Sequence, residues 1–360
     1  MPGLLKPLRF TLPFGFLALT GLGVWIGGVW QLLPIACAPA LLCGLDHALG
    51  WDRDEQGPEP DHHVACRMLP RLYVGLQIAV LLLGALRVSD RDAGLLDLLG
   101  TTVVVGVGVG VFGMLAAHDL IHRRAASDRA IGLAMLACAG YMHFRIAHIH
   151  GHHVRAASLE DPATARRGES VYGFFARSVA GQFTEAWRFE AARLRRRREP
   201  VIGPSNRMLG YIAIELALGA GFAWLGARPF AFWVGQAALA VFLLEAFNYI
   251  AHYGLVRRCD ARGVLEPIRA QHSWNCSRRM NNWSMFNMGR HGDHHLRPAG
   301  AYETLAPIAG APELPTGYAG SILLALVPPL WRQVMDPRAA AWTTGRARDR
   351  DLRQEWVSAG

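Results

Sequence analysis

Six long apolar stretches constrain the fold of this chain more than any other feature of its sequence. A helix that crosses a bilayer needs about 20 mostly apolar residues. The chain is 52% hydrophobic and only 18% charged, which is more apolar than an average soluble protein. A large soluble core is the alternative, but continuous runs of this length favour an all-α integral membrane protein with six transmembrane helices. The predicted spans are 11–28, 30–46, 70–87, 94–117, 208–227 and 229–250.

Basic residues are distributed unevenly between the two predicted sides of the membrane. With the N-terminus inside, the short outer loops 27–31, 88–93 and 226–230 and their edges carry few arginines. The inner side carries most of the others, including Arg123, Arg124, 195–198, Arg257 and Arg258. Because cytoplasmic loops are enriched in basic residues, we predict a bacterial inner-membrane protein whose N-terminus faces the cytoplasm.

The chain has no long linker and no internal repeat, so we predict one domain over 1–360. Its inner side consists mainly of two regions, 118–207 and 251–360, which form a histidine-rich cytoplasmic cap. The basic run 194–199 could be read as a nucleic-acid patch, but the accompanying motifs of a nucleic-acid-binding module are absent. We expect it to face lipid headgroups and predict no nucleic-acid partner.

Nine histidines lie in four clusters, each close to an apolar stretch or an adjoining inner helix. Histidines four residues apart on a helix share a face, so each of the three multi-histidine clusters can present several imidazoles together. Four such sets converging beneath the membrane provide enough ligands for two metal ions. The nine are His118, His122, His148, His152, His153, His252, His291, His294 and His295.

The ligand type narrows the choice of metal. Imidazole suits iron and other borderline cations. Zinc is the competing choice, but a zinc hydrolase needs only three protein ligands and a general base, so nine histidines are excessive. The six cysteines show no Cys-x-x-Cys spacing, which argues against a rubredoxin-type iron site or a zinc ribbon within the chain.

The order of the motifs resembles a known family. HDLIHRR, HIHGHHVR followed by LEDP, NYIAHYGLVR, HSWN and RHGDHH are similar to the motifs of the membrane-bound alkane hydroxylases (alkane 1-monooxygenases) and the xylene-type monooxygenases. Both groups belong to the fatty acid desaturase-like superfamily. Three residues separate His148 from His152, as in the hydroxylases, whereas desaturases have two before the corresponding His pair.

The resemblance implies a chemistry as well as a fold. It implies that the nine histidines bind two iron ions, which with O₂ hydroxylate the terminal or benzylic methyl group of an alkane or alkylbenzene. Electrons are then expected from a separate rubredoxin or ferredoxin-type donor and its reductase. The alternative is a desaturase or lipid hydroxylase with the same iron site. A metal carrier is disfavoured because the spans contain few ionisable residues.

Several positions depart from the family pattern or are expected to support the ligands. Asp119 stands where the family usually has Glu, and Ala147 and Ala251 replace residues that are Glu in alkane hydroxylases. Ligand imidazoles are usually held through their second ring nitrogen. Candidates for this support are Asp119, Asp161, Asp293 and Asn248, and His272 is expected to support a ligand or to line the substrate pocket.

Overall fold

The computed structural model describes residues 7–52 and 64–344, so residues 345–360 of the second predicted inner region lie outside it. The described chain is helical, with three isolated β-bridges and no strand. Six helices are long and apolar enough to cross a membrane, which confirms the six predicted spans. They are Pro7–Ile26, Gly28–Leu49, Val64–Ser89, Leu95–His122, Arg207–Leu225 and Ala227–His252.

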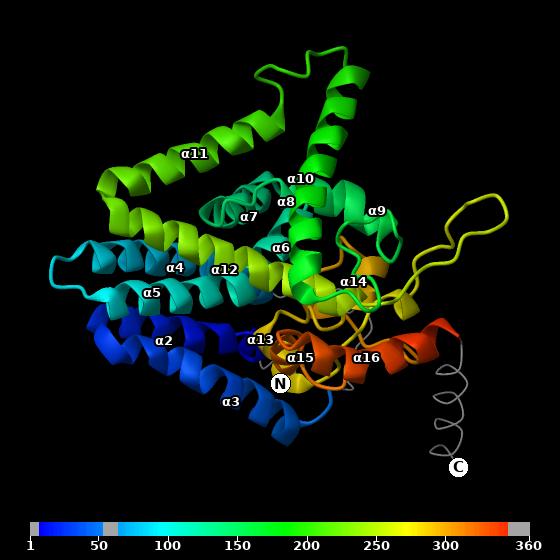
Figure 1. The fold of residues 1–360 in the computed structure, drawn as a ribbon, viewed down its shortest axis with the longest axis horizontal. Coiled ribbons are helices and arrows are strands. Elements are labelled where there is room, and N and C mark those ends of the chain that lie inside the picture. Colours follow the sequence, from blue (N-terminus) through cyan, green and yellow to red (C-terminus); the bar gives the residue numbers. More distant parts are fainter. Residues whose placement is uncertain (1–6, 53–63, 345–360) are drawn as a thin grey trace.

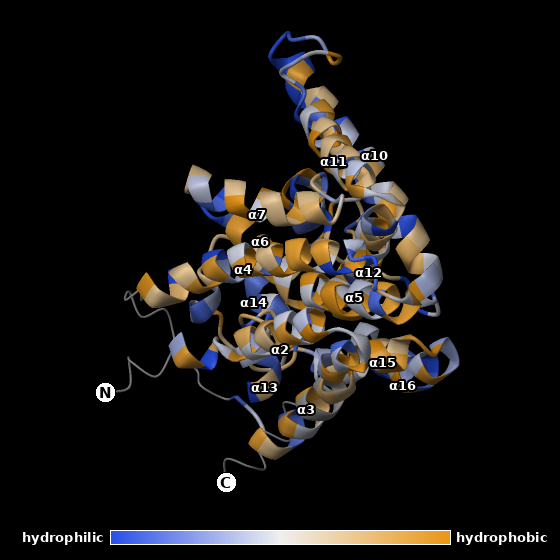
Figure 2. Cartoon of the chain, turned by 90° about the vertical axis from the view of Figure 1, so that its left-hand side faces the viewer, coloured by the Kyte–Doolittle hydropathy of each residue, from blue (hydrophilic) through white to orange (hydrophobic). Residues whose placement is uncertain are grey.

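The spans lie roughly side by side, and the segments that carry the histidines gather at one end of them (Figure 1). Hydropathy colouring shows apolar residues along most of the span helices (Figure 2). The principal helices of the spans are α2 (Leu12–Ile26), α3 (Leu33–Leu49), α4 (Val64–Ser89), α5 (Leu95–Val107), η2 (Gly108–Gly113), α6 (Met114–His122), α11 (Arg207–Leu225) and α12 (Ala227–His252).

Small residues allow the fourth and sixth spans to pack closely. A Cβ atom at Gly110 would lie 2.8 Å from the Cα of Ala240, and one at Gly106 would lie 3.2 Å from the Cα of Gln236. Because helices in lipid associate largely through close packing of this kind, these glycines fix α12 against the stretch that leads into α6. The ends of these two spans therefore deliver His118 and His252 to the same region.

The opposite end of the bundle is held by one buried carboxylate, which we call the Asp97 hub. Asp97 Oδ1 accepts hydrogen bonds from Gly28 N at 2.9 Å, Gln31 Nε2 at 2.8 Å and Arg87 Nη2 at 2.8 Å. Its Oδ2 accepts one from Gly94 N at 3.1 Å, at the start of α5. The hub thus joins the ends of the first four spans.

The histidine end is covered by α10 (Val171–Arg196), an amphipathic helix. The Glu245 carboxylate of α12 accepts hydrogen bonds from Ser178 Oγ at 2.6 Å and Gln182 Nε2 at 2.9 Å on α10. It also accepts one from Tyr141 OH at 3.1 Å. This buried carboxylate therefore fixes α10 beside the end of the sixth span.

The remaining helices of the histidine end are short or interrupted. The apolar stretch 318–335 is interrupted by Pro328 and Pro329 and divides between α15 (Tyr318–Ala325) and α16 (Pro328–Thr343). The other short elements are α7 (Ala126–Cys138), α8 (Phe144–Ala147), η3 (His148–His152), α9 (His153–Arg155), η4 (Ala270–His272), α13 (Arg279–Ser284), α14 (His291–Leu296) and η5 (Tyr302–Thr304).

Candidate metal centre

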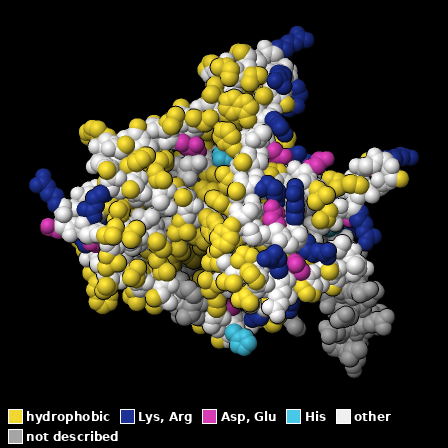
Figure 3. Space-filling view, viewed as in Figure 1, with side chains coloured by type: hydrophobic (Ala, Val, Ile, Leu, Met, Phe, Trp, Pro, Cys, Tyr) yellow, Lys and Arg dark blue, Asp and Glu magenta, His cyan; other side chains and the backbone are white. Residues whose placement is uncertain are grey.

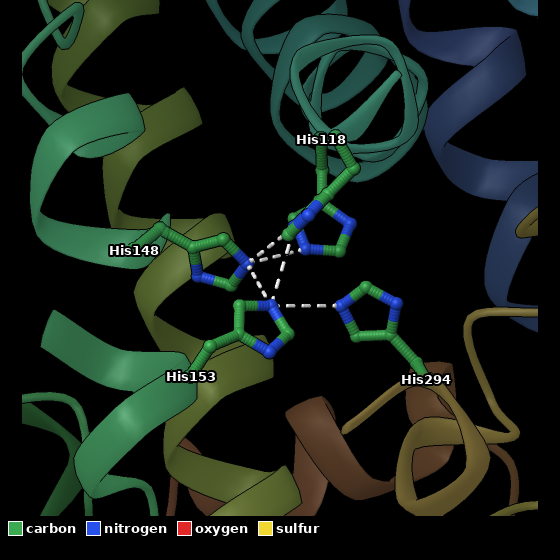
Figure 4. Close-up of side chains that lie close together, drawn as sticks. His118, His148, His153 and His294 are labelled. Carbon is green, nitrogen blue, oxygen red and sulfur yellow. Dashed lines mark hydrogen bonds between the residues drawn. The ribbon is translucent and has the colours of Figure 1, made fainter. Parts of the chain in front are cut away.

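The structure brings all nine predicted histidines together, in two groups. Within each group the possible ligand nitrogens lie within 4.8 Å of one another. In Figure 4 the rings of four members of the larger group point toward one another from α6, η3, α9 and α14. The five-histidine group is His118, His122, His148, His153 and His294, and the four-histidine group is His152, His252, His291 and His295.

The Nε2 atoms of the five-histidine group are spaced as metal ligands require. His148 Nε2 lies 2.7 Å from His118 Nε2, 3.1 Å from His122 Nε2 and 3.0 Å from His153 Nε2. His294 Nε2 lies 3.2 Å from His153 Nε2. Two nitrogens at right angles around a metal, each about 2.1 Å from it, are about 3.0 Å apart. The residues present therefore fit a bound ion.

The four-histidine group shows the same spacing with complete burial. His252 Nε2 lies 3.1 Å from both His291 Nε2 and His295 Nε2, and the last two are 3.0 Å apart. His152 Nε2, the fourth possible ligand atom, is buried and has no hydrogen-bond partner among the residues that the structure describes. All four residues are buried. A cation bound here would be shielded from bulk water.

The second ring nitrogens show why these are not ordinary hydrogen bonds between imidazoles. His152 Nδ1 lies 2.8 Å from Asp161 Oδ2, and His252 Nδ1 lies 3.2 Å from the carbonyl oxygen of His272. Both oxygens accept, so each Nδ1 carries the proton, and a neutral imidazole has only one. The two Nε2 atoms therefore present lone pairs to the centre of the group, where a cation is the complementary partner.

Burial also sets the protonation state of the ligands that lie outside the spans. Burial, reinforced by the neighbouring imidazoles, lowers the pKa of His291, His294 and His295 well below the ordinary value of 6.5. The neutral imidazole is the form that binds metals. These three side chains are consequently ready to coordinate a cation at neutral pH.

The second histidine cluster is divided in a way that helical spacing did not predict. The backbone N–H of His153 donates to the carbonyl oxygen of His148, which closes a π turn over η3. Since a π turn repeats after five residues rather than four, His148 and His153 join the same group. His152 belongs to the other group, although its ring stacks on that of His148 at 5.2 Å. The i, i+4 spacing thus places the His148 and His152 rings side by side, but the two rings contribute to different groups.

Helix α14 serves both groups from a single turn. His291 and His295, four residues apart, contribute to the four-histidine group, whereas His294 contributes to the five-histidine group. The centroids of the His294 and His295 rings are 5.7 Å apart. One short helix thereby fixes the two groups relative to each other.

The predicted supporting residues lie in different environments. Asp161 contacts a histidine ring nitrogen, but Asp119 forms an ion pair with Arg123 at 2.6 Å. Asp293 pairs with Arg297 and accepts a hydrogen bond from Ala306 N at 2.8 Å.

Asn248 and His272 complete the predicted set. Asn248 Nδ2 lies 3.4 Å from Glu245 Oε1. His272 supports His252 through its backbone carbonyl, and its imidazole Nε2 lies 3.3 Å from Glu266. Because this contact is made by the backbone carbonyl oxygen, the residue type at position 272 could not predict it.

Apolar contacts around the histidines were also not predicted. The Phe144 ring stacks on His148, with centroids 4.7 Å apart, and the Phe247 ring meets the edge of His291 at 5.5 Å. Ala147 and Ala251 are buried. The departures from the alkane-hydroxylase pattern therefore leave alkyl surface near the groups where that pattern has carboxylates.

Similarity to known proteins assigns the chain to a family. The family model described as fatty acid desaturase matches residues 94–322, a region that contains all nine histidines. The chain belongs to the fatty acid desaturase family. It is 38% identical over 302 residues to alkane 1-monooxygenase 1 of Pseudomonas aeruginosa, covering 81% of this chain and 79% of that relative.

Two further relatives support the same family assignment. The alkane 1-monooxygenase of Pseudomonas putida is 34% identical over 334 residues, covering 90% of this chain and 83% of the relative. The xylene/toluene monooxygenase hydroxylase component of Pseudomonas putida is 28% identical over 328 residues, covering 89% and 86%. The resemblance predicted from the histidine motifs is confirmed.

Proposed function

We propose that this protein is a membrane monooxygenase that hydroxylates the terminal or benzylic methyl group of an alkane or alkylbenzene with O₂. The observation that carries the proposal is the convergence of nine imidazoles in two groups at the ends of apolar spans. Relatives named alkane 1-monooxygenase and xylene/toluene monooxygenase support both the reaction and a hydrophobic substrate.

We infer that each group holds one iron ion. The five-histidine group offers five imidazole nitrogens and the four-histidine group offers four. Imidazole-rich sites suit iron as well as zinc, and a reaction with O₂ requires the redox-active metal of the two. When bound, iron supplies the electron-transfer chemistry that activates O₂.

The residues around the groups hold the ligands and exclude water. Asp161 fixes the ring of His152 and is itself held by the Thr164 hydroxyl, 2.7 Å from Asp161 Oδ2. Such partners orient a ligand and raise its basicity. The Phe144 ring stacks on the His148 imidazole and covers one of its faces. A rigid, dry site is what attack on an unactivated C–H bond needs.

An apolar cavity lies on the route by which we propose that a hydrocarbon enters. It has a volume of about 60 Å³ and lies between α3, η2, α13 and α15. Most of its lining is apolar, including Leu42, Phe112 and Ile322, with Asp46, Asn281 and Ser284 as the polar members. Phe112 lies on the same span as His118, within two helical turns of it. Hydrophobic side chains cover much of the surrounding span surface (Figure 3). A substrate dissolved in the bilayer would reach the histidines without crossing water.

We also propose an orientation and an electron supply. The excess of arginine at the histidine end supports a cytoplasmic position for the metal centre in a bacterial inner membrane. The lack of Cys-x-x-Cys spacing supports a separate rubredoxin or ferredoxin-type donor with its reductase. In this orientation, a donor protein in the cytoplasm lies on the same side of the membrane as the metal centre.

One experiment tests the reaction and the ligands together. Purified protein is analysed for iron and zinc, and then incubated in air with NADH, rubredoxin, its reductase and one substrate at a time: a medium-chain alkane, xylene or a fatty-acyl substrate. We expect about two irons per chain and products that have gained one oxygen atom. Products that have lost two hydrogens would instead establish the desaturase alternative.

Matched variants assign the ligands. His294→Ala and His152→Ala each remove one imidazole, one from each group, and we expect both to lose iron and hydroxylation. His150→Ala is the control, because His150 lies in the same segment but is exposed and belongs to neither group. Full activity of either ligand variant would contradict the assignment.

A further inference from the structure

The proposed reaction needs electrons that the chain does not store. Inserting one oxygen atom of O₂ into a C–H bond and reducing the other to water consumes two electrons and two protons. The cysteines lack the spacing of an iron–sulfur or rubredoxin site, and the histidine groups are largely buried. If the proposed function holds, electrons must therefore enter from a partner at a surface close to a ligand.

A surface cavity of about 270 Å³ meets this description. Residues 255–258, residues 266–272 and the end of α16 line it. These segments lie toward the histidine end, away from the Asp97 hub at the far end of the spans (Figure 1). A water-soluble protein approaching that end can reach the cavity without entering the bilayer.

The wall of this cavity contacts a predicted metal ligand directly. His272 lines the cavity, and its carbonyl oxygen lies 3.2 Å from Nδ1 of His252. The Nε2 atom of the same ring faces His291 Nε2 at 3.1 Å. One hydrogen bond therefore joins the cavity wall to His252, a member of the four-histidine group.

The cavity carries surplus positive charge. Arg257, Arg258 and Arg269 line it together with one carboxylate, that of Glu266. Glu266 is already engaged, because its Oε1 accepts a hydrogen bond from the backbone N–H of Arg258 at 2.9 Å and lies 3.3 Å from His272 Nε2.

The arginines are placed to receive an anion. Arg258 and Arg269 are exposed, whereas Arg257 is only 7% exposed and already donates from Nη2 to the carbonyl oxygen of Val154 at 2.8 Å and from Nη1 to that of Glu266 at 3.2 Å. Trp342 and the exposed Val256 add apolar contact surface. Arginine and aromatic side chains of this kind dominate the energy of protein interfaces.

We propose that this basic cavity is the docking site of a small acidic one-electron carrier protein, which places a carboxylate side chain against the exposed Arg258 and Arg269. The carrier gives up one electron per encounter, so two encounters supply one turnover. Complementary charge mainly accelerates such encounters. Arginine side chains are plentiful elsewhere at this end of the molecule (Figure 3), so the test must separate this cavity from the general charge.

The test uses the full-length, iron-loaded protein and reduced rubredoxin as the probe. In Arg258→Glu/Arg269→Glu we expect the second-order rate constant for reduction by rubredoxin to fall by about tenfold or more at low ionic strength. The difference should shrink near 1 M salt, where the Debye length is about 3 Å. Iron content and the rate of reduction by dithionite report whether the metal centre is intact.

Arg195→Glu/Arg196→Glu is the matched control, since it reverses two exposed charges at the end of α10, away from the cavity lining. An equal loss in this control would overturn the proposal in favour of general surface charge. Loss of iron or of dithionite reduction would show that the substitutions damage the centre. An effect present in vesicles with anionic lipid but absent in neutral vesicles would assign the arginines to lipid binding. Failure of the unsubstituted protein to hydroxylate would instead count against the proposed function.

Discussion

The two ends of the helical bundle each contain a buried polar cluster, and the two are satisfied in different ways. In the Asp97 hub, one carboxylate faces donors from Gly28, Gln31 and Arg87, so every contact has a proton to share. At the other end, imidazole nitrogens face one another at 2.7–3.2 Å. Where their second nitrogens donate elsewhere, as in His152 and His252, these atoms can only accept.

This difference separates a structural cluster from a metal site. Buried polar groups stabilise a fold only when their donors and acceptors match. The hub is complete with protein atoms alone, whereas the histidine groups become complete when a cation occupies them. The hub should therefore govern the stability of the spans, and the metals should govern the order of the histidine end.

Removal of the metals should have the largest effect, and it should affect the histidine end but not the Asp97 hub. We expect a strong chelator to abolish hydroxylation and to increase hydrogen exchange in α8, η3 and α14, because metal-binding energy at such sites contributes to folding. Exchange at the ends of α4 and α5, around the hub, should stay unchanged. Hydrogen exchange with mass spectrometry measures both regions in one sample, and equal loosening at the two ends would contradict the distinction.

The reciprocal change is Asp97→Ala. It leaves the Arg87 guanidinium, which is only partly buried, without its carboxylate partner, and loss of one partner of a buried pair costs about 3 kcal/mol. We expect a lower midpoint of unfolding in detergent, with normal iron content in the protein that remains folded. Asp92→Ala is the control, since Asp92 is exposed in the loop just before α5. Selective loss of iron in Asp97→Ala would show that the ends are not independent.

Asp161→Asn should give a smaller effect that is confined to the histidine end. The amide keeps the size of the side chain but removes the charge that holds the Nδ1 proton of His152. Changes of this kind typically weaken metal affinity or activity by about 10–100-fold. Iron titration should show the loss while the unfolding midpoint of the spans stays near that of the unsubstituted protein. Unchanged iron affinity would limit the role of Asp161 to its local hydrogen bond with Thr164.

Mild acid should have the smallest effect, and it should begin at the histidine end. Burial lowers the pKa of His291, His294 and His295 well below 6.5, so the unfolded chain binds more protons than the folded one as pH falls below that value. The folded metal-free state therefore loses stability there, by up to about 1.4 kcal/mol per pH unit for each such group. Iron release, measured from pH 7.5 to 5.5, should rise as pH falls. Greater retention of iron at pH 5.5 than at pH 7.5 would contradict the predicted direction of this pH dependence.

Sequence patterns predicted the parts of this protein that depend on local composition. The six spans follow from apolar length, which the bilayer requires of any helix that crosses it. The nine histidines follow from their number and spacing, and the structure gathers all of them. The Asp97 hub was invisible, because it joins Asp97 to residues 66 and 69 positions away along the chain.

The sequence by itself determined which imidazoles are available and that they lie near the ends of apolar helices. Only the tertiary structure decided how they are shared between two groups, because the π turn from His148 to His153 shifts the phase of the helix. It also decided that Asp161, rather than Asp119 or Asp293, meets a ligand ring nitrogen. Residue spacing fixes neighbours along one helix, whereas the direction of a ring and the identity of its partner depend on how separate helices pack.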